Sequence, residues 1–453
     1  MGEVVAQALR QQLEGKRVLV LGLGVSGRSA AHFCAQQGAR VVAADERELE
    51  ELPELAGLAP GIEVQSGGTL PDPADFDLVV PSPGIPRERY AGRARRVWGD
   101  IELAAQALRI PIIAVTGTNG KSTTVLLIEA LLRAAGLRAR AAGNLGTPAL
   151  SLVGEPLDWA VLEVSSFQLE SVESFRPRVA VVLNLTPDHL DRHGDFESYV
   201  ASKRRILATQ HADDVAVLNF DDPVVRKLAE RAPGRTLPFR RGAPCTAGAW
   251  LDGGAVVLRD ASGIRRLALD GFGLEGAHNL DNALAALCAV WGAGIDPERG
   301  LGALASFRGL PHRCERVATL DGVCFINDSK ATNPGAAARS LETATRPVLW
   351  IAGGRDKGLD FDALADAASS RVRTAFLIGE SAPLLERALS GRVPVEHAAD
   401  VEDAVRRAAA QARPRDVVLL APGCASFDQA ASFEERGERF RAAVARLAEE
   451  GPR

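Results

Sequence analysis

Short, uninterrupted apolar runs recur along the chain, and each is followed by a glycine-rich or polar turn. Such runs are typical of strands buried on both faces of a parallel sheet. We therefore expect strands at residues 17–21, 40–44, 78–80, 111–115, 159–164, 179–183, 215–218, 323–326, 348–352, 374–378 and 416–420. Helical periodicity lies between the runs, most clearly at residues 279–291 and 359–368. This alternation predicts an α/β fold in which helices cover mainly parallel sheets.

The alternation restarts near residue 98 and again after the Gly-Leu-Pro corner at residues 309–311. A chain of 453 residues is also too long for one ordinary core. We predict three domains, at residues 1–97, 98–307 and 308–453.

The sequence TGTNGKST at residues 116–123 lies between an expected strand and an expected helix. Backbone N–H groups of such a loop, together with the helix N-terminus, bind phosphate. Lys121 would then reach the β- and γ-phosphates, and the Ser122 hydroxyl would bind Mg²⁺. Val115 stands where the first glycine of GxxxxGK[ST] belongs, so the alternative is a simple glycine-rich turn. The strand–loop–helix context and the intact GKST favour an ATP site.

A second glycine turn, GLGVSG at residues 22–27, follows the first expected strand, and Asp45 closes the second strand about 20 residues later. The spacing fits NAD, but it fits another nucleotide or a structural turn equally well. It indicates only that a pyrophosphate could approach the backbone here, so a UDP-linked ligand remains open.

Several polar residues follow the apolar runs of the second domain. Glu163 ends one run, where a P-loop domain places an acidic Mg²⁺ partner. His189 follows another run; a lone histidine is more often a satisfied polar residue, but this position favours a site. Lys203 lies in an expected helix, where an exposed surface lysine is the simpler interpretation.

In the third domain, NDSKATNP at residues 327–334 and GGRDKG at residues 353–358 each follow an expected strand. The lysines in these two loops, Lys330 and Lys357, suggest that the loops bind an anion.

Composition adds a ranking of the lysines. Only six of the 53 Lys and Arg residues are lysines: Lys16, Lys121, Lys203, Lys227, Lys330 and Lys357. Lysines that remain in an arginine-rich chain should be enriched where a compact charge, or an amine that can lose its proton, is needed.

Charge and cysteine usage narrow the class of protein. The net charge of −5 is spread along the chain, which argues against binding to nucleic acid or an anionic membrane. No apolar run is long enough to span a bilayer, and residues 1–10 do not resemble a secretory signal. The six cysteines are scattered without a CxxC pair, which indicates reduced thiols in the cytoplasm.

The motifs GTNGKST, EVSSFQLE, NLTPDHLDRH, GAHNLDNALAA, GLPHR, NDSKATNP, GGRDKG and APGCASFDQ occur in this order. Together they resemble the Mur ligases over nearly the whole chain. SSFQLE and NDSKATNP most resemble the member that adds D-glutamate to UDP-N-acetylmuramoyl-L-alanine.

The resemblance implies a Rossmann-like UDP-binding domain, a central P-loop ATPase domain and a Rossmann-like C-terminal domain that binds the amino acid. It also implies a cytoplasmic, monomeric, ATP-dependent and ADP-forming ligase of peptidoglycan precursor synthesis. Such an enzyme phosphorylates the substrate carboxylate to an acyl phosphate, which the amine of glutamate then attacks.

The resemblance further implies roles for individual residues. The nucleotide would contact Gly117, Thr118, Asn119, Gly120, Lys121, Ser122, Thr123, Asn279, Asn282, Arg313 and Asp328. Two Mg²⁺ sites would use Ser122, Glu163, His189 and Lys203, the last as its N-carbamate, and the catalytic residues would be Lys121, Glu163, His189 and Lys203. The UDP-linked substrate would contact Gly24, Ser26, Asp45, Ser82, Gly84, Asn144 and Ser165. The glutamate would contact Lys330, Thr332, Lys357, Ser426 and Phe433.

Three alternatives differ in class. An NAD-dependent oxidoreductase would use residues 22–27 but would leave the P-loop and the third domain unexplained. A P-loop switch or motor would hydrolyse nucleotide without a small-molecule acceptor. A sibling ligase would add another amino acid or extend folate, although a folate ligase lacks a UDP-binding domain before its P-loop.

Overall fold

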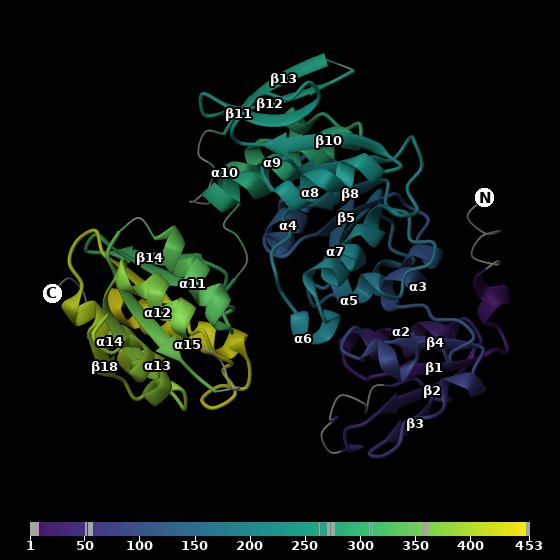
Figure 1. The fold of residues 1–453 in the computed structure, drawn as a ribbon, viewed down its shortest axis with the longest axis horizontal. Helices are drawn as coiled ribbons and strands as arrows, with labels where there is room; N and C mark the ends of the chain where they lie inside the picture. Colours follow the sequence, from purple (N-terminus) through teal and green to yellow (C-terminus); the bar gives the residue numbers. More distant parts are fainter. Residues whose placement is uncertain are drawn as a thin grey trace. The chain divides into compact units, whose positions relative to one another are not determined.

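The computed structural model describes residues 9–449, apart from 50–51, 53–57, 262, 270–271, 273–276, 308, 310, 345 and 356–360. The chain forms two compact units, Met1–Phe307 and Arg308–Arg453 (Figure 1). The first unit contains two sheets and the second contains one. The predicted α/β class is confirmed, whereas the three predicted domain ranges stay predictions.

The N-terminal sheet has four parallel strands in the order β3-β2-β1-β4. Their bounds are β1 Arg17–Leu21, β2 Arg40–Asp45, β3 Glu63–Ser66 and β4 Leu78–Pro81. The strand order reverses at β1, with β2 and β3 on one side of it and β4 on the other, so the loops after β1 and β4 lie side by side at the sheet's carboxyl edge. The glycine turn follows β1 and Ser82 follows β4.

The second sheet of the first unit has the order β13-β12-β11-β10-β9-β8-β5-β7-β6. The strands are β5 Ile112–Thr116, β6 Ala139–Gly143, β7 Trp159–Glu163, β8 Val179–Val182, β9 Val215–Asn219, β10 Arg235–Arg240, β11 Gly248–Asp252, β12 Ala255–Asp260 and β13 Gly263–Ala268. The described helices of this unit are α2 Val25–Gln36, α3 Asp100–Ala107, α4 Lys121–Ala134, α5 Ser166–Leu169, α6 Leu190–His193, α7 Phe196–Arg204, α8 Pro223–Leu228, α9 Ala277–Gly292 and α10 Gly302–Ser306.

The second unit is a six-stranded sheet in the order β14-β15-β19-β16-β17-β18, with helices on both faces (Figure 1). The strands are β14 Glu315–Leu320, β15 Val323–Asn327, β16 Val348–Gly353, β17 Val372–Ile378, β18 Val395–His397 and β19 Val417–Leu420. The described helices are α11 Pro334–Thr343, α12 Asp362–Ser369, α13 Ala382–Leu389, α14 Val401–Gln411 and α15 Phe433–Glu449. Loops after β15, β19 and β16 therefore neighbour one another.

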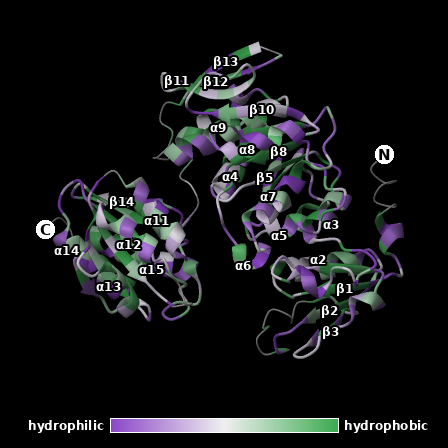
Figure 2. Cartoon of the chain, viewed as in Figure 1, coloured by the Kyte–Doolittle hydropathy of each residue, from purple (hydrophilic) through white to green (hydrophobic). Residues whose placement is uncertain are grey.

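The uninterrupted apolar runs are explained by burial on both sheet faces. In β5, Ile112 and Ala114 belong to one core cluster, and Ile113 and Val115 belong to another. Successive strand residues point to opposite faces, so both sets must be apolar. The helices in Figure 2 carry hydrophobic and hydrophilic residues together, as expected of helices with one face on a sheet.

The structure agrees with the predicted strands within a few residues, but it contains a meander that we did not predict. Strand β12 pairs antiparallel with both β11 and β13 at the edge of the central sheet. All six cysteines are described and none forms a disulfide, as expected. Among the described residues, no helix combines the length and apolar character needed to cross a membrane.

Candidate active site

The predicted phosphate-binding loop, residues 117–120, connects the end of β5 to the start of α4 at Lys121. Gly120 precedes the helix with a φ of 82°, in the left-handed region that favours glycine. A Cβ on Gly120 would also lie 2.3 Å from Asn282 Oδ1, so the side chain of Asn282 on α9 lies against the loop. Asn279, one turn earlier on α9, is buried and accepts a hydrogen bond from Asn282.

Two lysine side chains converge on one carbonyl of this loop. Lys121 Nζ donates to the backbone oxygens of Gly117 and Thr118, each at 2.9 Å. Lys203 Nζ also donates to the Gly117 oxygen at 2.9 Å, and to Thr116 Oγ1 at 3.4 Å. The two amines therefore meet at the loop that we predict to bind phosphate.

Lys203 is buried, so the simpler interpretation of it as an exposed surface lysine is wrong. Its side chain reaches inward from α7, over the ring of Tyr199, and the residue is only 2% exposed. Burial lowers the pKa of its amine well below the usual range, and the charge of Lys121 acts in the same direction. The lysine is therefore poised to be neutral, which a reacting amine requires.

The loops after β7 and β6 bring a carboxylate to the first turn of α4. Glu163 ends β7, is 2% exposed and accepts a hydrogen bond from Ser122 Oγ at 2.5 Å. Its other carboxylate oxygen accepts from Asn144 Nδ2 at 2.9 Å. The strand order β5-β7-β6 explains why these three residues meet. Thr123 lies half-buried beside Ser122 in the same turn.

Asn184, just after β8, holds the phosphate-binding loop in shape. Its Oδ1 accepts from the Asn119 N–H at 2.8 Å, and its Nδ2 donates to the Asn119 oxygen at 3.1 Å. The Thr118 hydroxyl contacts the Tyr199 hydroxyl at 2.9 Å. We did not predict a role for Asn184 or Tyr199 from the sequence. Asn184 directly follows a predicted strand, and this position could have predicted its role beside the loop. Nothing in the sequence indicated a role for Tyr199.

His189 lies apart from this cluster in the described structure. It has a left-handed φ of 53°, and its half-exposed side chain contacts the Phe167 ring and Asp188. Its contacts do not include Lys203. The buried histidine of this segment is His193, which contacts Ser166 Oγ at 3.1 Å and stacks on Phe167.

The predicted Mg²⁺ ligands fit the metal in chemistry. The Ser122 hydroxyl and the Glu163 carboxylate are hard oxygen donors, which Mg²⁺ prefers. The described residues contain no group of three or more His, Cys, Asp or Glu side chains that could hold a metal.

The N-terminal glycine turn is braced by Asp45 and Ser82. Asp45 Oδ2 accepts from the Leu23 N–H at 2.7 Å, and Arg47 lowers the pKa of the Asp45 carboxyl to about 2. Ser82 Oγ donates to the Gly22 oxygen at 2.7 Å. Two further predicted residues lie beside them: Gly24 caps α2, and Gly84 accepts from Arg192 at 3.2 Å.

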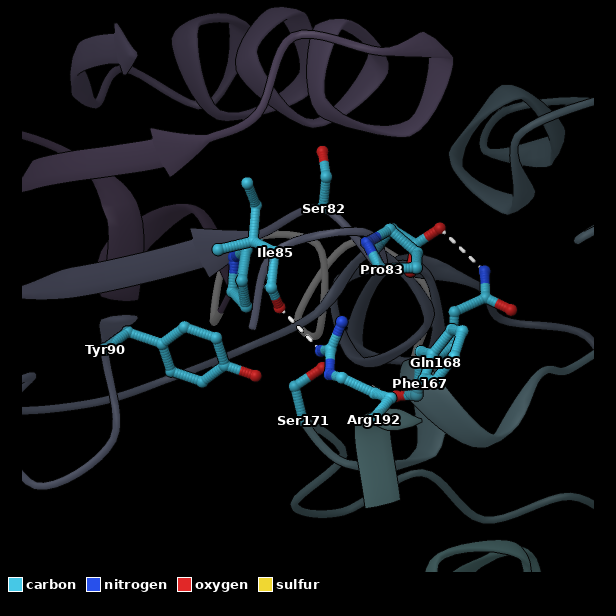
Figure 3. A pocket seen from close by; sticks show the side chains of 10 residues that line it. Ser82, Pro83, Ile85, Tyr90, Phe167, Gln168, Ser171 and Arg192 are labelled. Atoms are coloured by element: carbon cyan, nitrogen blue, oxygen red, sulfur yellow. Dashed lines mark hydrogen bonds between the residues drawn. The ribbon is translucent and has the colours of Figure 1, made fainter. Parts of the chain in front are cut away.

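The segment SSFQ begins with a capping box. Ser165 Oγ accepts from the Gln168 N–H at 3.2 Å, and Gln168 Oε1 accepts from the Ser165 N–H at 3.0 Å. A narrow pocket lies beside this turn. Its lining comes from the segment after β4, including Ser82, and from helices α3, α5 and α6, including Gln168 and Arg192 (Figure 3).

The second unit gathers several predicted residues around the start of α15. Lys330 Nζ lies 3.9 Å from the centre of the Phe433 ring, and the Phe433 oxygen accepts from Ser329 Oγ at 2.8 Å. Thr332 donates its N–H to the Lys330 oxygen, and Ser426 is buried after β19. Lys357 falls outside the described residues.

The two predicted nucleotide-binding residues of this unit lie near each other. Asp328 is buried, accepts from the Cys314 N–H at 3.1 Å and interacts electrostatically with Arg313. Burial raises the pKa of the Asp328 carboxyl.

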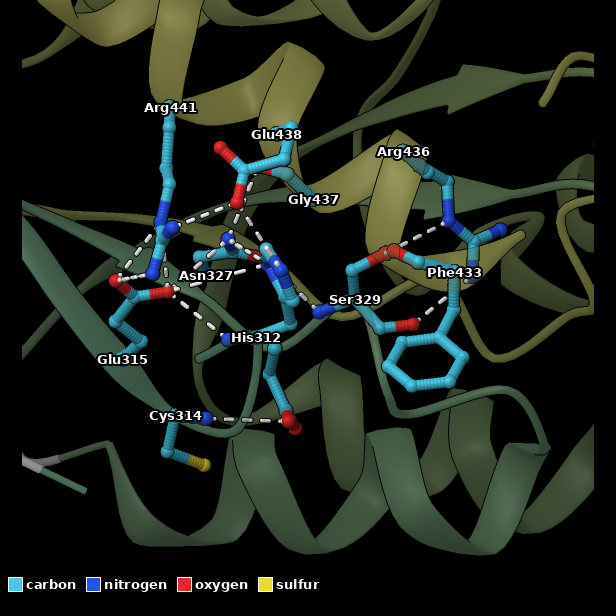
Figure 4. Close-up of polar contacts among 11 residues, drawn as sticks. His312, Cys314, Glu315, Asn327, Ser329, Phe433, Arg436, Gly437, Glu438 and Arg441 are labelled. Carbon is cyan, nitrogen blue, oxygen red and sulfur yellow. Dashed lines mark hydrogen bonds and ion pairs between the residues drawn. The ribbon is translucent and has the colours of Figure 1, made fainter. Parts of the chain in front are cut away.

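Buried Arg436 on α15 links the surrounding loops (Figure 4). It donates to Ser329 Oγ and to the backbone oxygens of Ser329, Cys424 and Ala425. We did not predict Arg436 or His312, which contacts Asn327 Nδ2 at 3.0 Å. Burial of an arginine cannot be seen in a sequence this rich in arginine.

Family models match three consecutive parts of the chain. They are the Mur ligase MurD-like N-terminal domain at residues 16–94, the Mur ligase middle domain at 115–290 and the Mur ligase glutamate ligase domain at 312–424.

Two curated relatives carry the name UDP-N-acetylmuramoylalanine–D-glutamate ligase. The protein from Acidobacterium capsulatum is 43% identical over 443 residues, which cover 95% of this chain and 96% of the relative. The protein from Anaeromyxobacter dehalogenans is 46% identical over 454 residues, which cover 95% and 97%.

Solved structures share the fold at lower identity. The MurF ligase from Thermotoga maritima in complex with ADP has a TM-score of 0.59 and 19% identity, covering 96% of both chains. The UDP-N-acetylmuramate-alanine ligase MurC from the same organism has a TM-score of 0.59 and 18% identity, covering 96% of this chain and 100% of the other.

Proposed function

The chain belongs to the Mur ligase family, and from this premise we propose that it joins D-glutamate to UDP-N-acetylmuramoyl-L-alanine. The reaction uses ATP, forms ADP and phosphate, and belongs to peptidoglycan precursor synthesis. The observation that carries the chemistry is the convergence of Lys121 and Lys203 on the Gly117 carbonyl, beside the Ser122–Glu163 pair.

In the first step, the terminal carboxylate of the UDP-linked substrate attacks the γ-phosphorus of ATP, and ADP leaves. The glycine loop and Lys121 hold the phosphates and offset the charge that develops on the transferring group. Ser122 and Glu163 would hold Mg²⁺, which supplies charge neutralisation of the phosphate oxygens when bound.

In the second step, the neutral amine of glutamate attacks the acyl phosphate. The tetrahedral intermediate loses phosphate and a proton, and an amide remains. Lys330, Thr332, Ser426 and Phe433, with Lys357, are the proposed glutamate-binding residues, whereas Arg313, Asp328, Asn279 and Asn282 are proposed for the nucleotide.

Lys203 would act as an N-carbamate. Its neutral amine attacks CO₂, one proton is lost, and the side chain changes from a neutral amine to an anion. Burial favours the neutral amine that this reaction requires. The carbamate and His189 would then contribute to a second Mg²⁺ site.

The UDP end of the substrate would lie on the N-terminal glycine turn, contacting Gly24, Ser26, Asp45, Ser82 and Gly84. The muramoyl-alanine end would contact Asn144 and Ser165. We propose a monomeric enzyme in the cytoplasm, where ATP and UDP-linked precursors are made.

Phosphate release from ATP tests this function. We expect release with UDP-N-acetylmuramoyl-L-alanine and D-glutamate together, and little release when either is omitted. The panel should include L-glutamate, D- and L-aspartate, and a folate acceptor. Preference for L-glutamate or aspartate would refute the proposed amino acid while leaving an acyl-phosphate ligase; activity on folate alone would refute the UDP-linked substrate.

A further inference from the structure

A chain of hydrogen bonds crosses the first unit between its two sheets. Asp100, the first residue of α3, bonds to the side chain of Ser26 and accepts from Gln168 Nε2 at 2.9 Å. Gln168 Oε1 in turn accepts from Ser165 Oγ at 3.1 Å and from the Ser165 N–H at 3.0 Å. The chain thus runs Ser26–Asp100–Gln168–Ser165.

The two inner members of this chain are buried polar groups. Asp100 is 3% exposed and Gln168 is 2% exposed. The donors to the Asp100 carboxylate are an amide, a hydroxyl and the N–H of Ile101, all of them neutral. A buried carboxylate without a cation is costly, and burial raises the pKa of the Asp100 carboxyl accordingly. If Asp100 and Gln168 only filled space, apolar side chains would do so without the free-energy cost of burying polar groups.

The outer members of the chain face the two ends of one proposed ligand. Ser26 lies in the glycine turn after β1, proposed for UDP, and Ser165 begins the turn after β7, proposed for the muramoyl-alanine end. The pocket beside Gln168 is also lined by Ser82 and Asp100, so the chain forms part of its wall (Figure 3).

We propose that Asp100 and Gln168 are positioning residues that fix Ser26 and Ser165 at the separation required by the two ends of the UDP-linked substrate. Because the loops are held before the substrate arrives, a long flexible ligand can engage both without a cost for ordering them. This inference rests on the proposed function. Neither residue contacts the reacting groups.

Replacing Asp100 by asparagine tests this series of hydrogen bonds. The Nδ2 group of the new side chain would be a donor that faces another donor, Gln168 Nε2. We expect Asp100→Asn to raise the KM for UDP-N-acetylmuramoyl-L-alanine about tenfold, with the KM for ATP within about twofold. UDP alone contacts only one of the two loops. Its Kd by calorimetry should therefore stay within about twofold, whereas the Kd of the whole substrate should rise about tenfold.

The double variant Asp100→Asn with Gln168→Glu restores the bond with donor and acceptor exchanged. It should recover most of the lost affinity for the whole substrate. Asp158→Asn, which breaks an exposed pair with Arg138, is the matched control and should leave both KM values unchanged. If Asp100→Asn does not fold, Gln168→Met removes the link between Asp100 and Ser165 and should give the same pattern.

The possible outcomes separate this proposal from the proposed function. Wild-type enzyme that releases no phosphate with UDP-N-acetylmuramoyl-L-alanine and D-glutamate would refute the function. If the wild type is active, any one of three results would refute the positioning role alone. Asp100→Asn could weaken the binding of UDP as much as that of the whole substrate, it could lower only the melting temperature, or the double variant could fail to recover affinity.

Discussion

At the scale of single residues, the phosphate-binding loop derives its character from two lysines that share one carbonyl. A buried ammonium is unfavourable, and a second positive charge nearby makes it more so. Lys121 is half-buried and stays available to phosphate, whereas Lys203 is enclosed. The two side chains therefore differ in chemistry although they meet at the same atom.

Replacing Lys203 separates charge from chemistry. Lys203→Arg introduces a permanent cation, which cannot form a carbamate. We expect Lys203→Arg and Lys203→Ala both to lose about 10²-fold or more in turnover. Acetate should partly restore Lys203→Ala by supplying the missing carboxylate. Lys227→Arg, an exposed lysine of the same unit, is the control; an active Lys203→Arg would disprove the carbamate.

The lowered pKa of Lys203 also predicts how stability depends on pH. The unfolded lysine holds its proton up to a pH of about 10.4. The folded lysine loses the proton at lower pH, so the unfolded chain binds more protons between these two values. The free energy of unfolding should therefore rise with pH in that window. Urea unfolding at pH 7 and pH 9, in CO₂-free buffer, should show a smaller rise for Lys203→Met. Equal rises would contradict the neutral buried amine.

Single residues were predicted from the sequence with uneven success. The scarcity of lysine drew attention to Lys121, Lys203, Lys330 and Lys357, and the structure brings the amines of the first two to one carbonyl. Their separation of some 80 positions along the chain hid this meeting and the burial of Lys203. Tyr199 and Arg436 were missed because burial is decided by tertiary packing, which a single residue's neighbours do not reveal.

At the scale of elements, the order of strands assembles the site. β8, β5, β7 and β6 are neighbours, so Asn184, the glycine loop, Glu163 and Asn144 share one edge of the sheet. The apolar runs predicted β5, β7 and β8 but not β6, and they could not predict which strands are adjacent. The meander β11–β13 escaped prediction because its edge strands carry many polar residues, as in β13 with Arg265 and Arg266.

The two hydrogen bonds between Asn184 and Asn119, which we call the clamp, predict how the glycine loop depends on its neighbouring strand. Asn184→Ala removes both hydrogen bonds to Asn119, so the loop must be ordered by the nucleotide itself. We expect the KM for ATP to rise about tenfold, with a smaller change for the UDP-linked substrate. Asn184→Asp keeps the acceptor for the Asn119 N–H but loses the donor, and should be intermediate. A KM for ATP within twofold of wild type in Asn184→Ala would show that the clamp is dispensable.

At the scale of the whole molecule, the described core clusters each belong to one compact unit. The clusters of the first unit lie within residues 9–307, and those of the second lie within residues 317–447. A unit with its own core is expected to unfold as its own cooperative transition. We therefore expect calorimetry to resolve two transitions, and a ligand or mutation confined to one unit should move one of them.

Arg436 provides the mutation for that experiment. Arg436→Met fills similar space but leaves the backbone oxygens of Ser329 and Cys424 without their donor. Loss of such a buried group costs about 3 kcal/mol, which lowers the melting temperature of the Arg308–Arg453 unit by roughly 5–10 °C. The transition of the other unit should stay in place, and the exposed Arg387→Met should move neither. UDP-N-acetylmuramoyl-L-alanine at 100 times its Kd should add about 2.7 kcal/mol to the Met1–Phe307 unit alone. A shift of both transitions by Arg436→Met would show that the two units unfold together.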